Sequence, residues 1–201
     1  MILFDKNRIA AAFKEADKYI VTQKIMTTKE DEYRSFLEFY NIFSAQLPEL
    51  NLSFDTIEKI TKDLVYNSEK YVFYDDVYTV IPKLKNKYRL AIVSDAWPSL
   101  LDVYDANDMT AYFDAIVISS FLGTSKPDRK MYCTALAELG VEPHEAIFVD
   151  DSIKNCKGAM NEGIKTVLIC RDKGSYLREK VKSVGRDYKV INNLNQLAKM
   201  L

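Results

Sequence analysis

The chain has 201 residues, of which 48% are hydrophobic and 28% are charged, and its formal net charge is -1 at pH 7. This balance is typical of a soluble globular protein with one domain and an insertion, or with two small domains. The small net charge gives no basic surface for nucleic acid. No apolar run approaches the length of a membrane span, so a membrane partner is not predicted either.

Composition also limits the chemistry that histidine and cysteine could perform. The only histidine is His144, which argues against His-dependent catalysis and His-rich zinc sites. The cysteines Cys133, Cys156 and Cys170 are odd in number and widely spaced, so we predict reduced thiols in a cytoplasmic protein. Any catalytic chemistry must therefore use carboxylates, hydroxyls and amines.

Residues 8–72 show helical periodicity throughout, and three helices are predicted there. The second begins at a capping box formed by Thr28 and Asp31, and Asp55 can cap the third. The apolar stripes are rich in aromatic side chains, which we interpret as core, with substrate-pocket lining as the alternative. The residues predicted to face inward are Ile9, Phe13, Ala16 and Ile20, then Tyr33, Phe36, Leu37, Tyr40, Phe43 and Leu47, then Ile57, Ile60 and Leu64.

The pattern changes at residues 73–76, which we interpret as a link to a second region. The acid pair Asp75 and Asp76 is interpreted as a solvated linker or a helix cap. Beyond it, short apolar runs alternate with helical segments, which predicts an α/β domain with parallel strands. The predicted strands are residues 89–93, 115–118, 146–149, 165–169 and 188–191.

Polar side chains follow three of these strands at the point where each ends. Ser94 and Asp95 follow the first, Lys126 lies in the loop after the second, and Asp150 and Asp151 follow the third. Ligands of open α/β sheets bind at this carboxyl edge. A hydroxyl, a fixed lysine and an acid pair that could hold Mg²⁺ would suit a phosphoryl group. The alternatives are a strand-end hydroxyl, a solvated lysine and an acid that only caps a helix.

In type and order these residues resemble three motifs of the haloacid dehalogenase (HAD) superfamily of phosphohydrolases. Ser94 at the end of its strand matches the second motif, Lys126 before Pro127 matches the third, and Asp150 with Asp151 matches the fourth. The resemblance covers about residues 73–169. Each motif is weak alone, but three in order, each with a strand before it, form a specific signal.

The resemblance implies an α/β fold: a Rossmann-like parallel sheet core with helices on both faces, plus a small all-helical cap. Residues 8–72 would form the cap, and residues 73–201 with 1–7 would form the core. It also implies a Mg²⁺-dependent phosphatase that acts on a small phosphorylated metabolite through an aspartyl-phosphate. The implied site comprises Ser94 and Lys126 as catalytic residues, Ser94, Asp95 and Lys126 as phosphate-binding residues, and Asp150 and Asp151 as metal ligands. The dehalogenase branch of the family fits less well, because it does not need the acid pair.

The first motif of the family is where this chain departs from the pattern. That motif reads strand, Asp, any residue, Asp, and the segment 2–4 does lead to Asp5. Asn7, however, stands where the second acid is expected, and an amide cannot act as a general acid or base. Two interpretations stay open: Asp5 is the nucleophile, or Asp5 starts a helix and the first strand is missing from this chain. The second predicts a shortened or catalytically impaired relative with a binding or regulatory role.

Overall fold

The computed structural model describes residues 5–201, and the chain divides into two compact units. One unit comprises Met1–Tyr71 and Ala96–Asn107, and the other comprises Val72–Asp95 and Asp108–Leu201. The apolar segment 2–4, considered above for the first motif, lies outside the described residues. Nothing in the sequence pattern had separated 96–107 from the residues around it.

The described part of the first unit is helical. The second helix begins at the predicted capping box, because Thr28 accepts from the Asp31 backbone N–H and donates its own N–H to the Asp31 carboxylate. The third begins at Ser53, whose side chain accepts from Thr56 N–H, so the prediction that Asp55 caps it was wrong. The elements are α1 (Lys6–Ile20), α2 (Lys29–Ala45), α3 (Phe54–Tyr66), α5 (Leu100–Ala106) and the 3-10 turns Pro48–Leu50 and Ser68–Lys70.

Aromatic side chains fill the core of this helical unit. Phe39 is buried with Ala16 and Ile20, and Phe36 packs beside them. The ring of Trp97 meets that of Phe36 edge to face, with centroids 5.4 Å apart, so this tryptophan packs within the helical unit. The inward face of α3 also differs from the prediction: its buried residues are Ile57, Thr61 and Val65, whereas Ile60 is 37% exposed.

The second unit is an α/β domain in which all strand pairs are parallel, which confirms the predicted fold class. The strands are β1 (Ala91–Ser94), β2 (Ala115–Ile118), β3 (Ile147–Asp150), β4 (Lys165–Ile169) and β5 (Tyr188–Ile191). The helices are α4 (Asp75–Lys85), α6 (Ser119–Leu122), α7 (Arg129–Leu139), α8 (Ile153–Asn161), α9 (Lys173–Lys182) and α10 (Leu194–Met200), with 3-10 turns at Thr110–Tyr112 and Pro143–Glu145.

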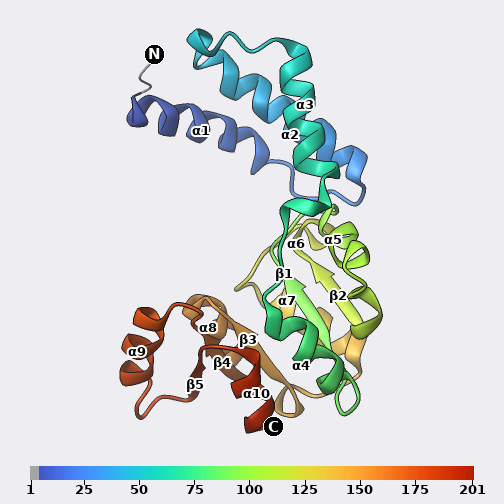
Figure 1. Cartoon of the computed structure of the whole chain (residues 1–201), viewed down its shortest axis with the longest axis vertical. Coiled ribbons are helices and arrows are strands. Elements are labelled where there is room, and N and C mark those ends of the chain that lie inside the picture. The colour runs from blue at the N-terminus through green and yellow to red at the C-terminus, as the bar shows by residue number, and fades with distance from the viewer. Residues whose placement is uncertain (1–4) are drawn as a thin grey trace. The chain divides into compact units, whose positions relative to one another are not determined.

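The strands form two sheets, β1–β2 and β3–β4–β5, held between layers of helices (Figure 1). Helix α7 serves both sheets: Met131 packs with Val117 of β2, whereas Tyr132 packs with Phe148 of β3. On the opposite face, Leu84 of α4 packs in one cluster with Val167 of β4. Because one helix covers both sheets, the two sheets lie in a single layer.

Asp76 is a buried structural anchor and not a solvated linker residue as predicted. Its carboxylate pairs with Arg171 at 2.6 Å and accepts the Leu194 backbone N–H at 2.6 Å. These bonds connect the start of α4 to the start of α10 and to the residues after β4. The sequence gave no sign of this role, because both partners are distant in the chain.

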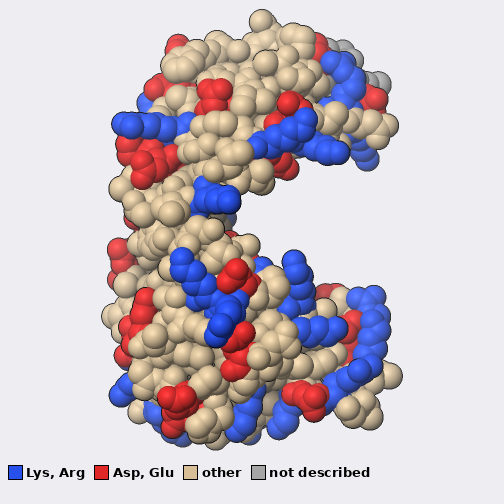
Figure 2. All heavy atoms as spheres, turned by 180° about the vertical axis from the view of Figure 1, so that it is seen from behind, with Lys and Arg blue, Asp and Glu red and all other residues tan. Residues whose placement is uncertain are grey.

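Charged side chains are mixed in sign on the face that Figure 2 shows, where acidic and basic groups alternate over both units. This agrees with the small net charge. None of the helices in residues 5–201 is long and apolar enough to cross a membrane.

Candidate active site

A buried ion pair lies at the carboxyl edge of the second unit. The Lys126 ammonium is 2.8 Å from Asp150 Oδ2, and the two side chains are only 11% and 7% exposed. Lys126 Nζ also lies 5.8 Å from the centroid of the Phe148 ring. Two charges this well removed from water are costly unless each has partners, so the geometry around them must be held firmly.

The second oxygen of Asp150 is held by neutral donors. Asp150 Oδ1 accepts the Ser152 backbone N–H at 2.8 Å and the Asn155 side-chain amide at 3.1 Å. Asn155 is one turn into α8, and its backbone oxygen accepts the Tyr132 hydroxyl at 2.9 Å. Every oxygen of Asp150 therefore has a partner, and the prediction that Asn155 helps to hold the acidic loop agrees with these contacts.

Local structure fixes the loop that carries Lys126. Gly123 ends α6 with φ +67, a left-handed conformation that glycine adopts without strain. Asp128 caps α7 by accepting the Lys130 backbone N–H at 2.8 Å, as predicted. Pro127 packs so closely on Gly158 of α8 that a Cβ there would lie 2.6 Å from the Pro127 Cβ. The peptide bond between Lys126 and Pro127 is cis.

The other predicted site residues belong to the same edge. Ser94 is the last residue of β1, and Asp95 follows it. Asp95 Oδ1 accepts the Lys126 backbone N–H at 2.8 Å, so this acid positions the lysine loop. Asp151 directly follows β3 and is exposed. The structure thus links Asp95, Lys126 and Asp150 by direct bonds, and places Ser94 and Asp151 next to them in the chain.

The family model described as haloacid dehalogenase-like hydrolase matches residues 5–169, which is most of the chain. The chain belongs to this family. The resemblance drawn from Ser94, Lys126 and the acid pair Asp150–Asp151 is therefore confirmed at the level of the family.

Curated relatives of this HAD-like hydrolase include phosphatases. A glyceraldehyde 3-phosphate phosphatase of Pyrococcus furiosus is 26% identical over 218 aligned residues, covering 99% of this chain and 88% of the relative. The pyrophosphatase PpaX of Bacillus velezensis is 30% identical over 115 residues, or 54% of this chain and 53% of the relative. Bifunctional epoxide hydrolase 2 of Rattus norvegicus is 33% identical over 112 residues, and only 20% of its length is covered.

Solved structures give the same fold. The putative HAD-hydrolase YfnB from Bacillus subtilis matches with a TM-score of 0.64 and 18% identity, covering 100% of this chain and 84% of that one. A 2-haloacid dehalogenase from Pseudomonas syringae matches with a TM-score of 0.65 and 14% identity, covering 98% and 80%. At these identities the matches support the HAD-like fold and do not choose between its branches.

Cys156 of this HAD-like hydrolase lies below the site but is not a nucleophile. Burial, and then the nearby Asp150 charge, raise the pKa of the thiol to about 12, so the thiol stays protonated near neutral pH. Burial is also the main reason why the pKa of the Tyr132 hydroxyl lies above its ordinary value. Tyr132 therefore acts as a hydrogen-bond donor to α8 and not as a base.

Magnesium was tested against the chemistry of the donors. Within residues 5–201, no group of three or more His, Cys, Asp and Glu side chains converges in a way that could hold a metal. Mg²⁺ does not require such a cage, since it binds through one or two carboxylates and completes its shell with water and phosphate oxygens. The acid pair fits this requirement, because Asp151 is exposed while Asp150 is held behind it by Lys126.

Asp5 is the N-cap of α1. Its Oδ1 accepts the Asn7 backbone N–H at 2.9 Å, and the helix starts at Lys6. This is the helix-start interpretation of Asp5 considered above. It does not exclude a second role, because a carboxylate that caps a helix still has a free oxygen.

Proposed function

We propose that this HAD-like hydrolase is a Mg²⁺-dependent phosphatase of a small phosphorylated metabolite. The observation that carries the proposal is the buried Lys126–Asp150 pair at the carboxyl edge of the parallel strands. A lysine fixed by a carboxylate and by its loop presents a positive charge that needs no reorganisation when phosphate arrives. The phosphatase names among the relatives support the same reaction class.

Three side chains are assigned to the phosphate in this proposal. The Ser94 hydroxyl donates a hydrogen bond to a phosphate oxygen, and the Lys126 ammonium offsets the negative charge. Asp151 holds Mg²⁺ directly, and Asp150 stands in or just behind that shell. When bound, Mg²⁺ would orient the phosphate and reduce its repulsion of a carboxylate nucleophile.

The proposed reaction has two displacements. A carboxylate oxygen attacks phosphorus, the ester P–O bond breaks, and the leaving oxygen takes a proton from water. Water then attacks phosphorus, so that the carboxylate and inorganic phosphate are released. Asp5 is the candidate nucleophile. A cytoplasmic location is part of the proposal, because the three cysteines are free thiols.

A second candidate function is phosphate or Mg²⁺ binding without turnover. Asp5 favours it, because its side chain is engaged in capping α1 and Asn7 replaces the second acid of the family motif. Such a protein would keep the Lys126–Asp150 pair for recognition or regulation. The two candidates differ in turnover and share ligand binding.

The test is hydrolysis of p-nitrophenyl phosphate and of glyceraldehyde 3-phosphate, with and without Mg²⁺. We expect Mg²⁺-dependent turnover that falls about 100-fold or more in Asp151→Asn and in Asp5→Asn, and that is unchanged in the exposed control Asp187→Asn. Calorimetric titration with Mg²⁺ and inorganic phosphate is run in parallel. Binding without turnover in the folded protein would reject the phosphatase and support the second candidate.

A further inference from the structure

The inner edges of the two sheets lack a neighbouring strand. Among the described strands, β1 pairs only with β2, and β3 pairs only with β4. In a parallel ladder, alternate residues direct their N–H and C=O groups to opposite sides. Each inner edge therefore presents a row of backbone donors and acceptors on the side that has no partner, and such groups require partners when they are buried.

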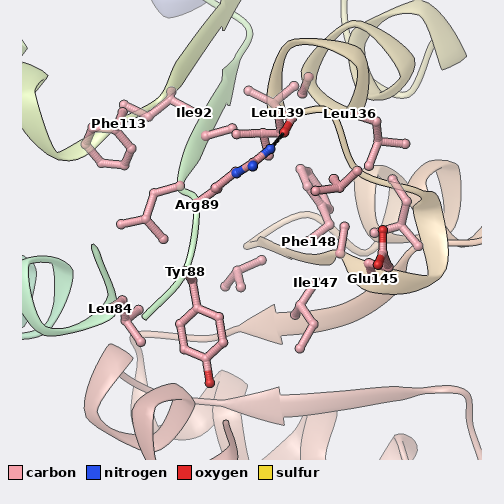
Figure 3. Close-up of a pocket in the computed structure, with 18 of the residues that line it drawn as sticks. Leu84, Tyr88, Arg89, Ile92, Phe113, Leu136, Leu139, Glu145, Ile147 and Phe148 are labelled. Carbon is pink, nitrogen blue, oxygen red and sulfur yellow. Dashed lines mark hydrogen bonds between the residues drawn. The ribbon is translucent and has the colours of Figure 1, made fainter. Parts of the chain in front are cut away.

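Both inner edges line one cavity of about 630 Å³, whose lining Figure 3 shows. Residues 91–93 of β1 form one side of it and residues 147–149 of β3 form the other. Apolar side chains of α7 cover one face of the cavity, and side chains of α4 and α10 cover the opposite face. We call this cavity the inter-sheet slot.

The strands beside the slot are more exposed than their outer neighbours. All four residues of β1 are only half-buried, and Ile147 of β3 is 41% exposed. In contrast, Val117 of β2 is 3% exposed and Leu168 of β4 is 2% exposed. The exposure is thus confined to the two facing edges, although α7 covers both sheets.

An extended peptide suits the slot better than an apolar small molecule does. An apolar ligand would fill the volume but would leave two rows of backbone groups without hydrogen bonds. A single strand satisfies both rows and also supplies apolar side chains to both helical layers. The guanidinium of Arg89, labelled in Figure 3, is bound to the Leu139 backbone oxygen at the end of α7, so it does not block strand pairing.

We propose that residues 1–4 occupy the inter-sheet slot as a strand parallel to β1 and β3. The segment Met-Ile-Leu-Phe is wholly apolar, as buried parallel strands are, and its four residues equal the length of β1 and of β3. Helices follow it before β1 begins, which is the strand–helix–strand connection that parallel strands require. This inference concerns the sheet and holds with or without phosphatase activity.

Hydrogen exchange of the full chain tests the proposal. We expect peptides covering 91–94 and 147–150 to exchange as slowly as those of β4, independently of protein concentration. In Leu3→Asp, which would bring a charge into the apolar slot, exchange of β1 and β3 should rise about ten-fold or more while β4 stays protected. Val184→Asp is the matched control, since Val184 is 82% exposed.

Each alternative outcome overturns the proposal in a different way. Fast exchange of β1 and β3 in the unmodified chain would mean that the slot is empty. Protection that is unchanged in Leu3→Asp would mean that another segment fills it, and protection lost on dilution of a dimer would assign it to a second copy. If Leu3→Asp does not fold, the milder Leu3→Ala and the resistance of the unmodified chain to chymotrypsin at Phe4 replace it. Rapid cleavage at Phe4 would then reject the proposal.

Discussion

Asp150 of the α/β unit and Glu32 of the helical unit are both buried carboxylates, 8% and 1% exposed, but their partners differ in kind. Asp150 pairs with the Lys126 ammonium, whereas Glu32 accepts hydrogen bonds from the Ser99 backbone N–H at 2.8 Å and the Ser99 hydroxyl at 2.7 Å. Burial accordingly raises the pKa of Glu32 above its ordinary value, although the Ser99 bonds oppose the rise. A buried acid with a fixed cation marks a site for anions, and one with only neutral donors is a structural connection.

Lys126→Met should produce the largest effect, because Asp150 would lose its cation while staying buried. We expect the α/β unit to lose about 3–5 kcal/mol of unfolding free energy, measured by urea unfolding with exchange of β4 as the readout. The exposed Lys157→Met is the control. Adding Asp150→Asn to Lys126→Met should recover part of the loss, and the pair is not coupled if nothing is recovered.

Ser99→Ala tests the other half of the comparison. It removes one of the two donors to Glu32, and hydrogen bonds to a charged group contribute about 1.5–3 kcal/mol. Urea unfolding followed by the fluorescence of Trp97, which packs in the helical unit, should show a loss of that size. Ser183→Ala is the control, because its hydroxyl bonds only to the Lys180 backbone oxygen. Equal losses in the two variants would contradict the assigned role of Ser99.

Gly158→Ala addresses how the Lys126 loop is held beside Asp150. An added Cβ would meet the Pro127 Cβ at 2.6 Å and the Tyr132 hydroxyl at 2.7 Å, so we expect a loss of about 1–3 kcal/mol despite alanine's better helix propensity. Gly174→Ala is the control, since its nearest neighbour is a cap side chain at 3.3 Å. A stabilised Gly158→Ala would show that the contact with Pro127 is not rigid.

Glu32→Gln should change the pH dependence of stability. Because the folded-state pKa of Glu32 is raised, its stabilising contribution is complete below the unfolded pKa, near 4.5, and is lost as pH rises through the folded pKa. The unmodified protein should therefore lose stability relative to Glu32→Gln as pH rises from 4 to 7, measured by the urea midpoint of Trp97 fluorescence. A difference that is constant with pH would contradict the raised pKa.

The sequence predicted what local patterns determine. The strands 115–118, 165–169 and 188–191 were predicted with their observed bounds, because short apolar runs between helical segments are distinctive. The capping box of α2 was also predicted from Thr28 and Asp31. These features depend on neighbouring residues, so a single chain carries enough information for them.

Features that join distant residues were missed. Glu32 was absent from the predicted core because a glutamate on a helix is normally exposed, and only the fold brings Ser99 to it. Asp76 was interpreted as a linker residue because Arg171 is 95 residues away in the chain. In the site, the residue types at the strand ends were sufficient to select Lys126 and Asp150, but not to predict their 2.8 Å contact.

The division of the chain also determines how it can be cut. Both units are discontinuous, because Ala96–Asn107 belongs to the helical unit while the residues on either side belong to the other. A single nick near Tyr71 therefore leaves Trp97 and Ser99 packed on Phe36 and Glu32, and the two fragments stay associated. Neither unit can be expressed as one uninterrupted gene segment, and during synthesis the helical unit cannot complete its core until β1 has been made.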